Sequence, residues 1–126
     1  MALDDLKRNA MMAHLTGALE RGEDIGHYGR LVFAMVARHF IDEDQLCSLL
    51  QRNPGFSEQE ARGLCKQVEG RDYNPPRPQR ILEWQSQQSF PICPDPDVCN
   101  VYRDLRFPQH VYDHIQQFYE QKAEQQ

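Results

Sequence analysis

The run HYGRLVFAMVARHFI (residues 27–41) decides the fold, because its middle is apolar on every side. No charged residue interrupts the segment from Leu31 to Val36. A helix that is apolar all round is buried on all sides, so this run predicts the central helix of the protein. Asp24, a residue type that caps helix N-termini, stands just ahead of it.

Shorter helices are predicted on either side of the central one. Apolar residues recur every three or four positions from Leu6 to Arg21, and Gly22 follows as a stop signal. The clearest local signal is Ser57-Glu-Gln-Glu60, which has the pattern of a capping box. The remaining helices are predicted over residues 45–51, 58–69 and 79–87, with a last one that begins at Pro108.

These segments predict an all-α protein, a compact bundle of about five to six helices with one long irregular loop that contains cysteines. With 126 residues, the chain is expected to form one domain over residues 1–126, with a frayed tail at about 120–126. Apolar residues make up 40% of the chain and charged residues 26%, which is a globular composition and not a disordered one.

The cellular location of the protein is predicted from the lack of a membrane-span pattern and of a secretory-signal pattern in the sequence. No apolar run approaches the roughly 18 residues of a membrane span, and the N-terminus lacks a basic stretch followed by an apolar one. The protein is therefore expected to be soluble and cytoplasmic, with no membrane partner.

Two cysteines, Cys93 and Cys99, are the natural anchor of the loop over residues 88–107. With His110 and His114 they follow the Cys2His2 order of zinc sites. The spacing between the two cysteines, however, is wider than the usual two to four residues or so. A disulfide is the weaker alternative, because no secretory pattern is present. We expect free thiols packed in an ordered loop and no bound metal, with zinc on these four residues as the alternative.

Signals for catalysis have structural explanations. Asp95 and Asp97 lie in a turn-rich loop, and Asp42 and Asp44 lie at a helix start, where such residues are common. The chain contains no nucleophile elbow, Walker loop or glycine-rich dinucleotide loop. An enzyme acting alone is not expected.

A phosphate site is predicted at the start of the central helix. His27, Arg30 and Arg38 can share one face at about 100° per residue, and free N–H groups at a helix start favour an anion. The alternative is a buried helix whose polar residues face solvent.

A second group of basic residues lies between Arg62 and Arg80 and outnumbers its acidic neighbours, although the whole chain has a net charge of −5. The alternative for this group is a solvated helix and loop. Trp84 and Tyr102 are candidates for stacking on bases, but an aromatic residue at helical spacing is more often part of the core.

Taken in order, five motifs resemble the C-terminal iron–sulfur domain of the large subunit of archaeal and eukaryotic DNA primase. The resemblance covers about residues 9 to 115. The motifs are His27-Tyr-Gly29-Arg30, Phe56-Ser-Glu through Val68-Glu-Gly70, Tyr73-Asn-Pro75-Pro76, Cys93 with Cys99, and Phe107-Pro108.

The resemblance implies a fold that has lost its cofactor. Family members hold a four-iron, four-sulfur cluster with four cysteines, two of which match Cys93 and Cys99. The other two positions correspond to Met11 and Pro78, which cannot provide thiolate ligands. A degenerate domain without a cofactor is therefore expected, with a 4Fe–4S cluster or zinc as the alternative.

The function that the resemblance implies is a non-catalytic module that holds template DNA and a 5′-triphosphate or initiating nucleotide for a replication or priming partner. His27, Arg30 and Arg38 would contact phosphates. The partners would be single-stranded or primer-template nucleic acid and a primase catalytic subunit or other replication protein. The residues expected near nucleic acid are Arg62, Lys66, Arg71, Tyr73, Arg77 and Arg80. The alternative, motivated by the acidic net charge, is a protein-interaction domain that keeps the fold without binding nucleic acid.

Overall fold

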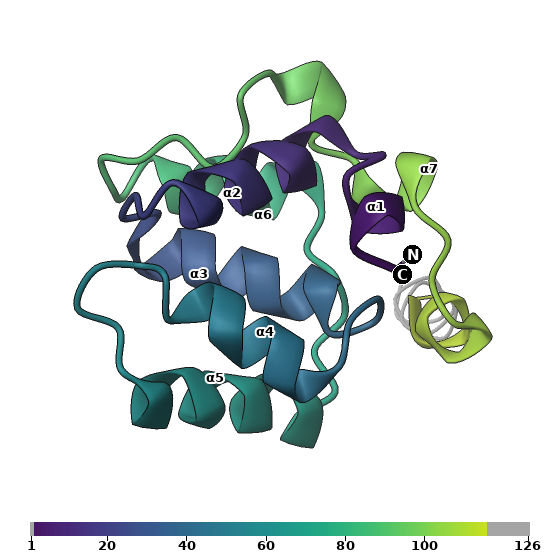
Figure 1. Cartoon of the computed structure of the whole chain (residues 1–126). Helices are drawn as coiled ribbons and strands as arrows, with labels where there is room; N and C mark the ends of the chain where they lie inside the picture. The colour runs from purple at the N-terminus through teal and green to yellow at the C-terminus, as the bar shows by residue number, and fades with distance from the viewer. Residues whose placement is uncertain (1, 116–126) are drawn as a thin grey trace.

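The computed structural model describes residues 2–115, in which every regular element is a helix (Figure 1). The prediction of an all-α protein is confirmed for this range, and the predicted frayed tail lies outside the described residues. The elements are α1 (Ala2–Leu6), α2 (Ala10–Glu20), α3 (Gly26–Ala37), α4 (Glu43–Leu50), α5 (Glu58–Gly70), α6 (Pro78–Gln85), the 3-10 helix η1 (Pro96–Val98) and α7 (Val101–Asp104). Residues 109–115 are also helical.

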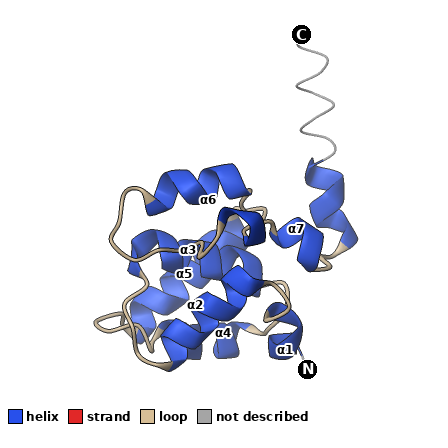
Figure 2. Cartoon of the chain, turned by 90° about the horizontal axis from the view of Figure 1, so that it is seen from above, coloured by secondary structure: helices blue, strands red, loops and turns tan. Residues whose placement is uncertain are grey.

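Helix α3 lies at the centre of the fold, as its apolar sequence predicted. It contacts α2, α4, α5 and α6. In Figure 1 it runs between α2 above and α4 and α5 below. Val32, Phe33 and Ala34 are completely excluded from solvent. Figure 2 shows α6 along one flank of this helical body and α7 at its end.

Short-range signals begin several helices where the sequence predicts them. The Ser57 hydroxyl accepts from the Glu60 amide, and the Glu60 carboxylate accepts from the Ser57 amide, both at 3.1 Å, so the capping box is confirmed. Asp42 caps α4 by accepting from the Gln45 amide at 2.8 Å. Helix α6 has a proline, Pro78, in its first turn.

The predicted helix from Leu6 to Arg21 is confirmed as α2 over most of its length, but its predicted start is wrong, because the chain breaks between α1 and α2. The break comes at Asn9, whose side-chain oxygen accepts from the Met12 amide at 3.0 Å and starts α2. Apolar spacing continues across the break, so periodicity alone does not detect it.

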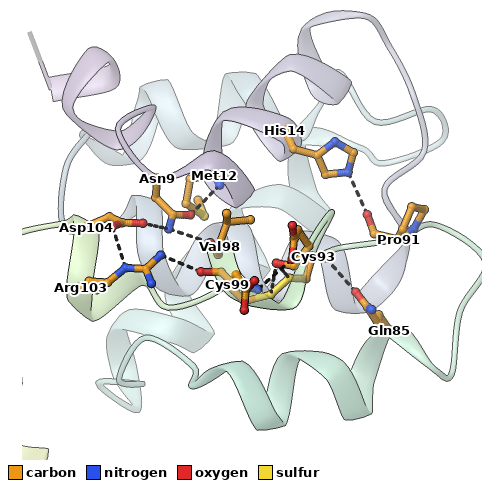
Figure 3. The surroundings of a disulfide bond; sticks show 12 residues. Asn9, Met12, His14, Gln85, Pro91, Cys93, Val98, Cys99, Arg103 and Asp104 are labelled. Atoms are coloured by element: carbon orange, nitrogen blue, oxygen red, sulfur yellow. Dashed lines mark hydrogen bonds and ion pairs between the residues drawn. A yellow bond between two sulfur atoms is a disulfide. The ribbon is translucent and has the colours of Figure 1, made fainter.

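Asn9 also links the N-terminal part of the described chain to its C-terminal part. Its side chain is completely buried. The side-chain nitrogen donates to the Val98 carbonyl at 3.1 Å and to the Asp104 carboxylate at 2.9 Å (Figure 3). One amide group therefore caps α2 and holds the segment from η1 to α7 against it.

A pair of free cysteines joins α4 to α5 in the core. Cys47 and Cys65 are both buried, and their sulfur atoms lie 3.3 Å apart. Burial is the main reason that the pKa of Cys65 is raised, with a further contribution from its contact with Cys47. Both residues therefore act as small apolar core groups.

Within residues 2–115, no helix combines the length and the apolar character that crossing a bilayer requires.

Asn9→Ala is expected to lower the free energy of unfolding by about 2–3 kcal/mol, because it removes a helix cap and two partly buried hydrogen bonds. Asn9→Asp separates these roles, since it keeps the capping oxygen but turns a second oxygen toward Asp104. Urea denaturation should show Asn9→Asp to be less damaging at acidic pH than at neutral pH, where both carboxyl groups are charged. Equal loss at both pH values would contradict the assigned role of the nitrogen.

Candidate functional site

The cysteine loop is closed by a disulfide between Cys93 and Cys99 (Figure 3). The prediction of free thiols is wrong. Their Cα atoms are 5.7 Å apart, within the usual range for a disulfide. Asp95 makes this approach possible, because its side chain accepts from the Asp97 amide at 3.0 Å and turns the chain back at η1.

The alternative zinc set of Cys93, Cys99, His110 and His114 is not assembled. Both cysteines are in the disulfide, whereas His114 lies 3.4 Å and His110 lies 4.0 Å from carboxylate oxygens of Asp72. Within residues 2–115, no cluster of three or more His, Cys, Asp or Glu side chains has a geometry suited to a metal ion. The histidines instead hold residues 109–115 beside Asp72.

The N-terminus of α3 already has acceptors for its backbone amides. Gly26 donates to the Asp24 carboxylate and Tyr28 donates to the side chain of Gln88, both at 2.9 Å. Arg30 lies 3.3 Å from the same Asp24 carboxylate. Its guanidinium also covers the ring of Phe56, 4.6 Å from the ring centroid. A carboxylate and an amide therefore occupy the place where a phosphate was predicted.

Arg38, at the other end of α3, has a different set of partners. Only 10% of its side chain is exposed, and it donates to the Asp72 carboxylate at 2.8 Å and to the Tyr73 carbonyl at 3.0 Å. Its hydrogen bond is the main reason that the pKa of Asp72 is lowered. Asp72 has a φ of 47°, in the left-handed region, and Arg38 stabilises this turn after α5.

His27 is exposed, with its ring 5.1 Å from that of Tyr28. Arg30 and Arg38 each have an intramolecular carboxylate partner, and these partners differ. The structure thus does not direct the three side chains at one open position. The phosphate site on α3 stays a prediction.

The basic group between Arg62 and Arg80 separates into two parts. Arg62 pairs with Glu58 and Asp44, both at 3.2 Å, and Lys66 is exposed on α5. The other part lies after α5, where Arg71 donates to the Tyr73 hydroxyl at 3.1 Å. Tyr73, Arg77 and Arg80 all line one pocket.

This pocket lies between α3, the connection from α5 to α6, α6 itself and α7. Its volume is about 490 Å³. Leu31 and Met35 of α3 provide apolar lining, and Trp84 and Tyr102 enter from α6 and α7. An adjoining hollow of about 570 Å³ shares Arg77, Tyr102 and Ile115 with it. Because the two hollows share these lining residues, we treat them together and call them the aromatic groove.

The charge of the aromatic groove contrasts with that of the whole chain. Among the described residues that line either hollow there are two arginines, Arg77 and Arg80, and no aspartate or glutamate. The chain as a whole has a net charge of −5. The charged side chains in the described lining of the groove are therefore basic.

Two aromatic rings that line the groove are held in place by contacts with other aromatic rings. Trp84 stacks on Tyr28 with ring centroids 5.7 Å apart and planes 14° apart. Tyr102 packs against Phe107 at 5.4 Å, and its hydroxyl donates to the Pro75 carbonyl. Burial raises the pKa of Tyr102 to about 12, so the hydroxyl stays protonated and keeps donating. Both rings are therefore fixed before a ligand arrives.

The sequence indicated part of this groove. Tyr73, Arg77 and Arg80 were predicted to lie near nucleic acid, and the structure places them together. Leu31, Met35 and Asn100 carried no functional signal, because they enter the groove only through the packing of α3, α6 and α7.

Comparisons with models of known families, with characterised proteins and with solved structures gave no match for this chain. The resemblance to the primase large subunit therefore stays a prediction carried by its motifs.

Stability is expected to fall as the pH decreases, because of His39. Its Nε2 atom is buried and has no hydrogen-bond partner among the described residues. Burial above all, with the charge of Arg38, lowers the pKa of His39 from 6.5 to about 4. Between these values the unfolded chain binds a proton that the folded chain does not, so the free energy of unfolding decreases from about pH 6.5 toward pH 4.

Replacing His39 with Phe should flatten this part of the pH profile, because phenylalanine keeps the contact with Phe107 and does not titrate. Urea denaturation across the same pH range measures the effect. His27→Phe, at an exposed position, controls for the loss of one histidine. An unchanged slope in His39→Phe would show that another group causes the pH dependence.

Proposed function

We propose that this protein is a non-catalytic binding module for nucleotides or nucleic acid and that the ligand occupies the aromatic groove. The observation that carries the proposal is the combination of fixed aromatic rings with Arg77 and Arg80 in the lining of the groove. This combination matches the two parts of a nucleotide, a flat base and an anionic phosphate.

The aromatic rings suit the base. Every base has a π face, and stacking on an aromatic side chain contributes about 1–3 kcal/mol for each base. Trp84 and Tyr102 line the groove and need no reordering, because Tyr28 and Phe107 pack behind them. The volumes of the two hollows both lie within the range of about 300–1,000 Å³ that small-ligand sites have.

The arginines suit the phosphate. A guanidinium presents several N–H groups in one plane and pairs well with phosphate oxygens. Arg80 lies 5.9 Å from the ring centroid of Trp84, so a cation and a stacking surface are neighbours. Arg77 lines both hollows and would meet a phosphate between them.

Side-chain amides supply groups that can read a base edge. Gln67 and Asn74 line the first hollow, and Gln79 and Asn100 line the second. An amide both donates and accepts hydrogen bonds, as the edges of the bases do. The described lining of the groove thus has stacking, charge and hydrogen-bonding groups but no nucleophile arranged with a base, which supports binding without chemistry.

The resemblance to the primase large subunit supports a role in replication or priming. On that interpretation the module would hold single-stranded or primer-template nucleic acid for a primase catalytic subunit or another replication protein. His27, Arg30 and Arg38 remain part of the proposal as phosphate contacts, although Arg30 and Arg38 would have to exchange their carboxylate partners for the ligand.

A protein-interaction domain is the second candidate. Leu31, Met35 and Pro76 give the groove an apolar part that also suits a peptide. Salt separates the two candidates, because phosphate binding weakens steeply as salt rises and an apolar contact does not.

Replacing Arg77 or Arg80 with Gln is expected to weaken binding of single-stranded oligodeoxythymidine by about threefold to tenfold each and to reduce the salt slope by about one. The chain has one tryptophan, Trp84, so its fluorescence reports binding in the groove directly. Titrations of ATP and of the oligonucleotide should both quench it in the wild type.

The matched control is Arg52→Gln, which removes one positive charge from an exposed position on another face. It should bind like the wild type. Equal affinity for the wild type and both groove variants would reject the groove as the site. Binding to neither probe at low salt would reject the function.

A further inference from the structure

The disulfide is connected to the α6 wall of the aromatic groove. The backbone amide of Cys93 donates to the side-chain oxygen of Gln85 at 2.8 Å (Figure 3). Gln85 is the last residue of α6 and directly follows Trp84. The first cysteine therefore holds the end of the helix that carries the tryptophan and Arg80.

The second cysteine is connected to the opposite wall. Asn100 directly follows Cys99 and caps α7, accepting from the Tyr102 amide at 3.1 Å. The Tyr102 hydroxyl then bonds to the carbonyl of Pro75, which also lines the groove. The chain from Cys99 to Tyr102 thus fixes the position of one stacking ring.

We propose that the Cys93–Cys99 disulfide is a reversible redox site that controls the affinity of the aromatic groove. The oxidised form ties both walls together, and the reduced form releases them from each other. This inference depends on the proposed function, because it assigns a regulation to the same groove.

The loop can accommodate both redox states. The Asp95 carbonyl oxygen lies 2.9 Å from the sulfur of Cys93 and 3.3 Å from that of Cys99. A disulfide has no S–H group to donate, whereas each thiol of the reduced form would find this acceptor already in place. Reduction therefore leaves no polar group without a partner.

The disulfide closes a short loop, so the effect of its reduction is limited to the surroundings of that loop. The two cysteines are six positions apart, and a short loop loses little entropy in the unfolded chain when it is cross-linked. Ile92 and Val101, on either side, are completely buried and anchor the loop in either state. Reduction should thus loosen the groove without unfolding the protein.

The chemical step is an exchange with a dithiol. The dithiol transfers two electrons and two protons, the S–S bond breaks to give two thiols, and the dithiol becomes a disulfide. Residues 94–97 between the cysteines are exposed, so opening of this turn gives the reagent access. A reducing compartment would keep the low-affinity form and an oxidising one the high-affinity form.

The test compares the full chain before and after treatment with dithiothreitol, with free thiols counted in each sample. Hydrogen exchange without ligand should become faster for the amides of residues 100–105 on reduction. Quenching of Trp84 by oligodeoxythymidine should show an affinity about threefold to tenfold lower in the reduced form, because pre-organisation is lost.

Two double variants assign the effect. Cys93→Ser with Cys99→Ser cannot form the bond and should match the reduced protein with or without dithiothreitol. Cys47→Ala with Cys65→Ala removes the buried thiols and should respond to dithiothreitol as the wild type does.

The outcomes separate this inference from the proposed function. Unchanged exchange after complete reduction, or faster exchange with unchanged affinity, would overturn the redox control. Binding to neither probe in either state would reject the nucleotide function and the affinity control with it, while the exchange data would still show whether the disulfide holds the groove wall.

Discussion

The buried side-chain amide of Asn9 is the interaction on which the arrangement of the rest depends. It starts α2 with its oxygen and holds Val98 and Asp104 with its nitrogen. The segment from η1 to α7 also packs Val101 into the core and bonds Tyr102 to the Pro75 carbonyl, but Asn9 is the side chain that links it to the start of α2. Tyr102 belongs to that segment, so the shape of the groove depends on the residue that caps the second helix.

Local chemistry explains why much of the fold could be predicted. The apolar run of α3, the capping box at Ser57 and the proline that opens α6 act within a few residues, and each produced the expected element. The break at Asn9 has a local part, the cap on the Met12 amide, and a tertiary part that the sequence does not reveal. An asparagine becomes completely buried there only when Val98 and Asp104 arrive to satisfy its nitrogen.

The site was predictable to a smaller extent for the same reason. Arg38 has the pattern of a surface arginine, but the turn at Asp72 brings a carboxylate to it. Because the Arg38 side chain is largely buried there, this ion pair is more favourable than an unpaired guanidinium. Trp84 has the spacing of a core residue, and only the approach of α7 turns its neighbourhood into a groove. The disulfide likewise depends on a turn that spacing does not reveal.

The buried thiols of Cys47 and Cys65 have a practical consequence for following the protein in solution. Alkylating reagents attack thiolates, and burial with a raised pKa for Cys65 suppresses that form in the folded state. These sulfurs therefore become reactive when α4 and α5 separate. The rate at which Cys47 and Cys65 are labelled therefore measures how often the core opens, and no cysteine has to be introduced for the measurement.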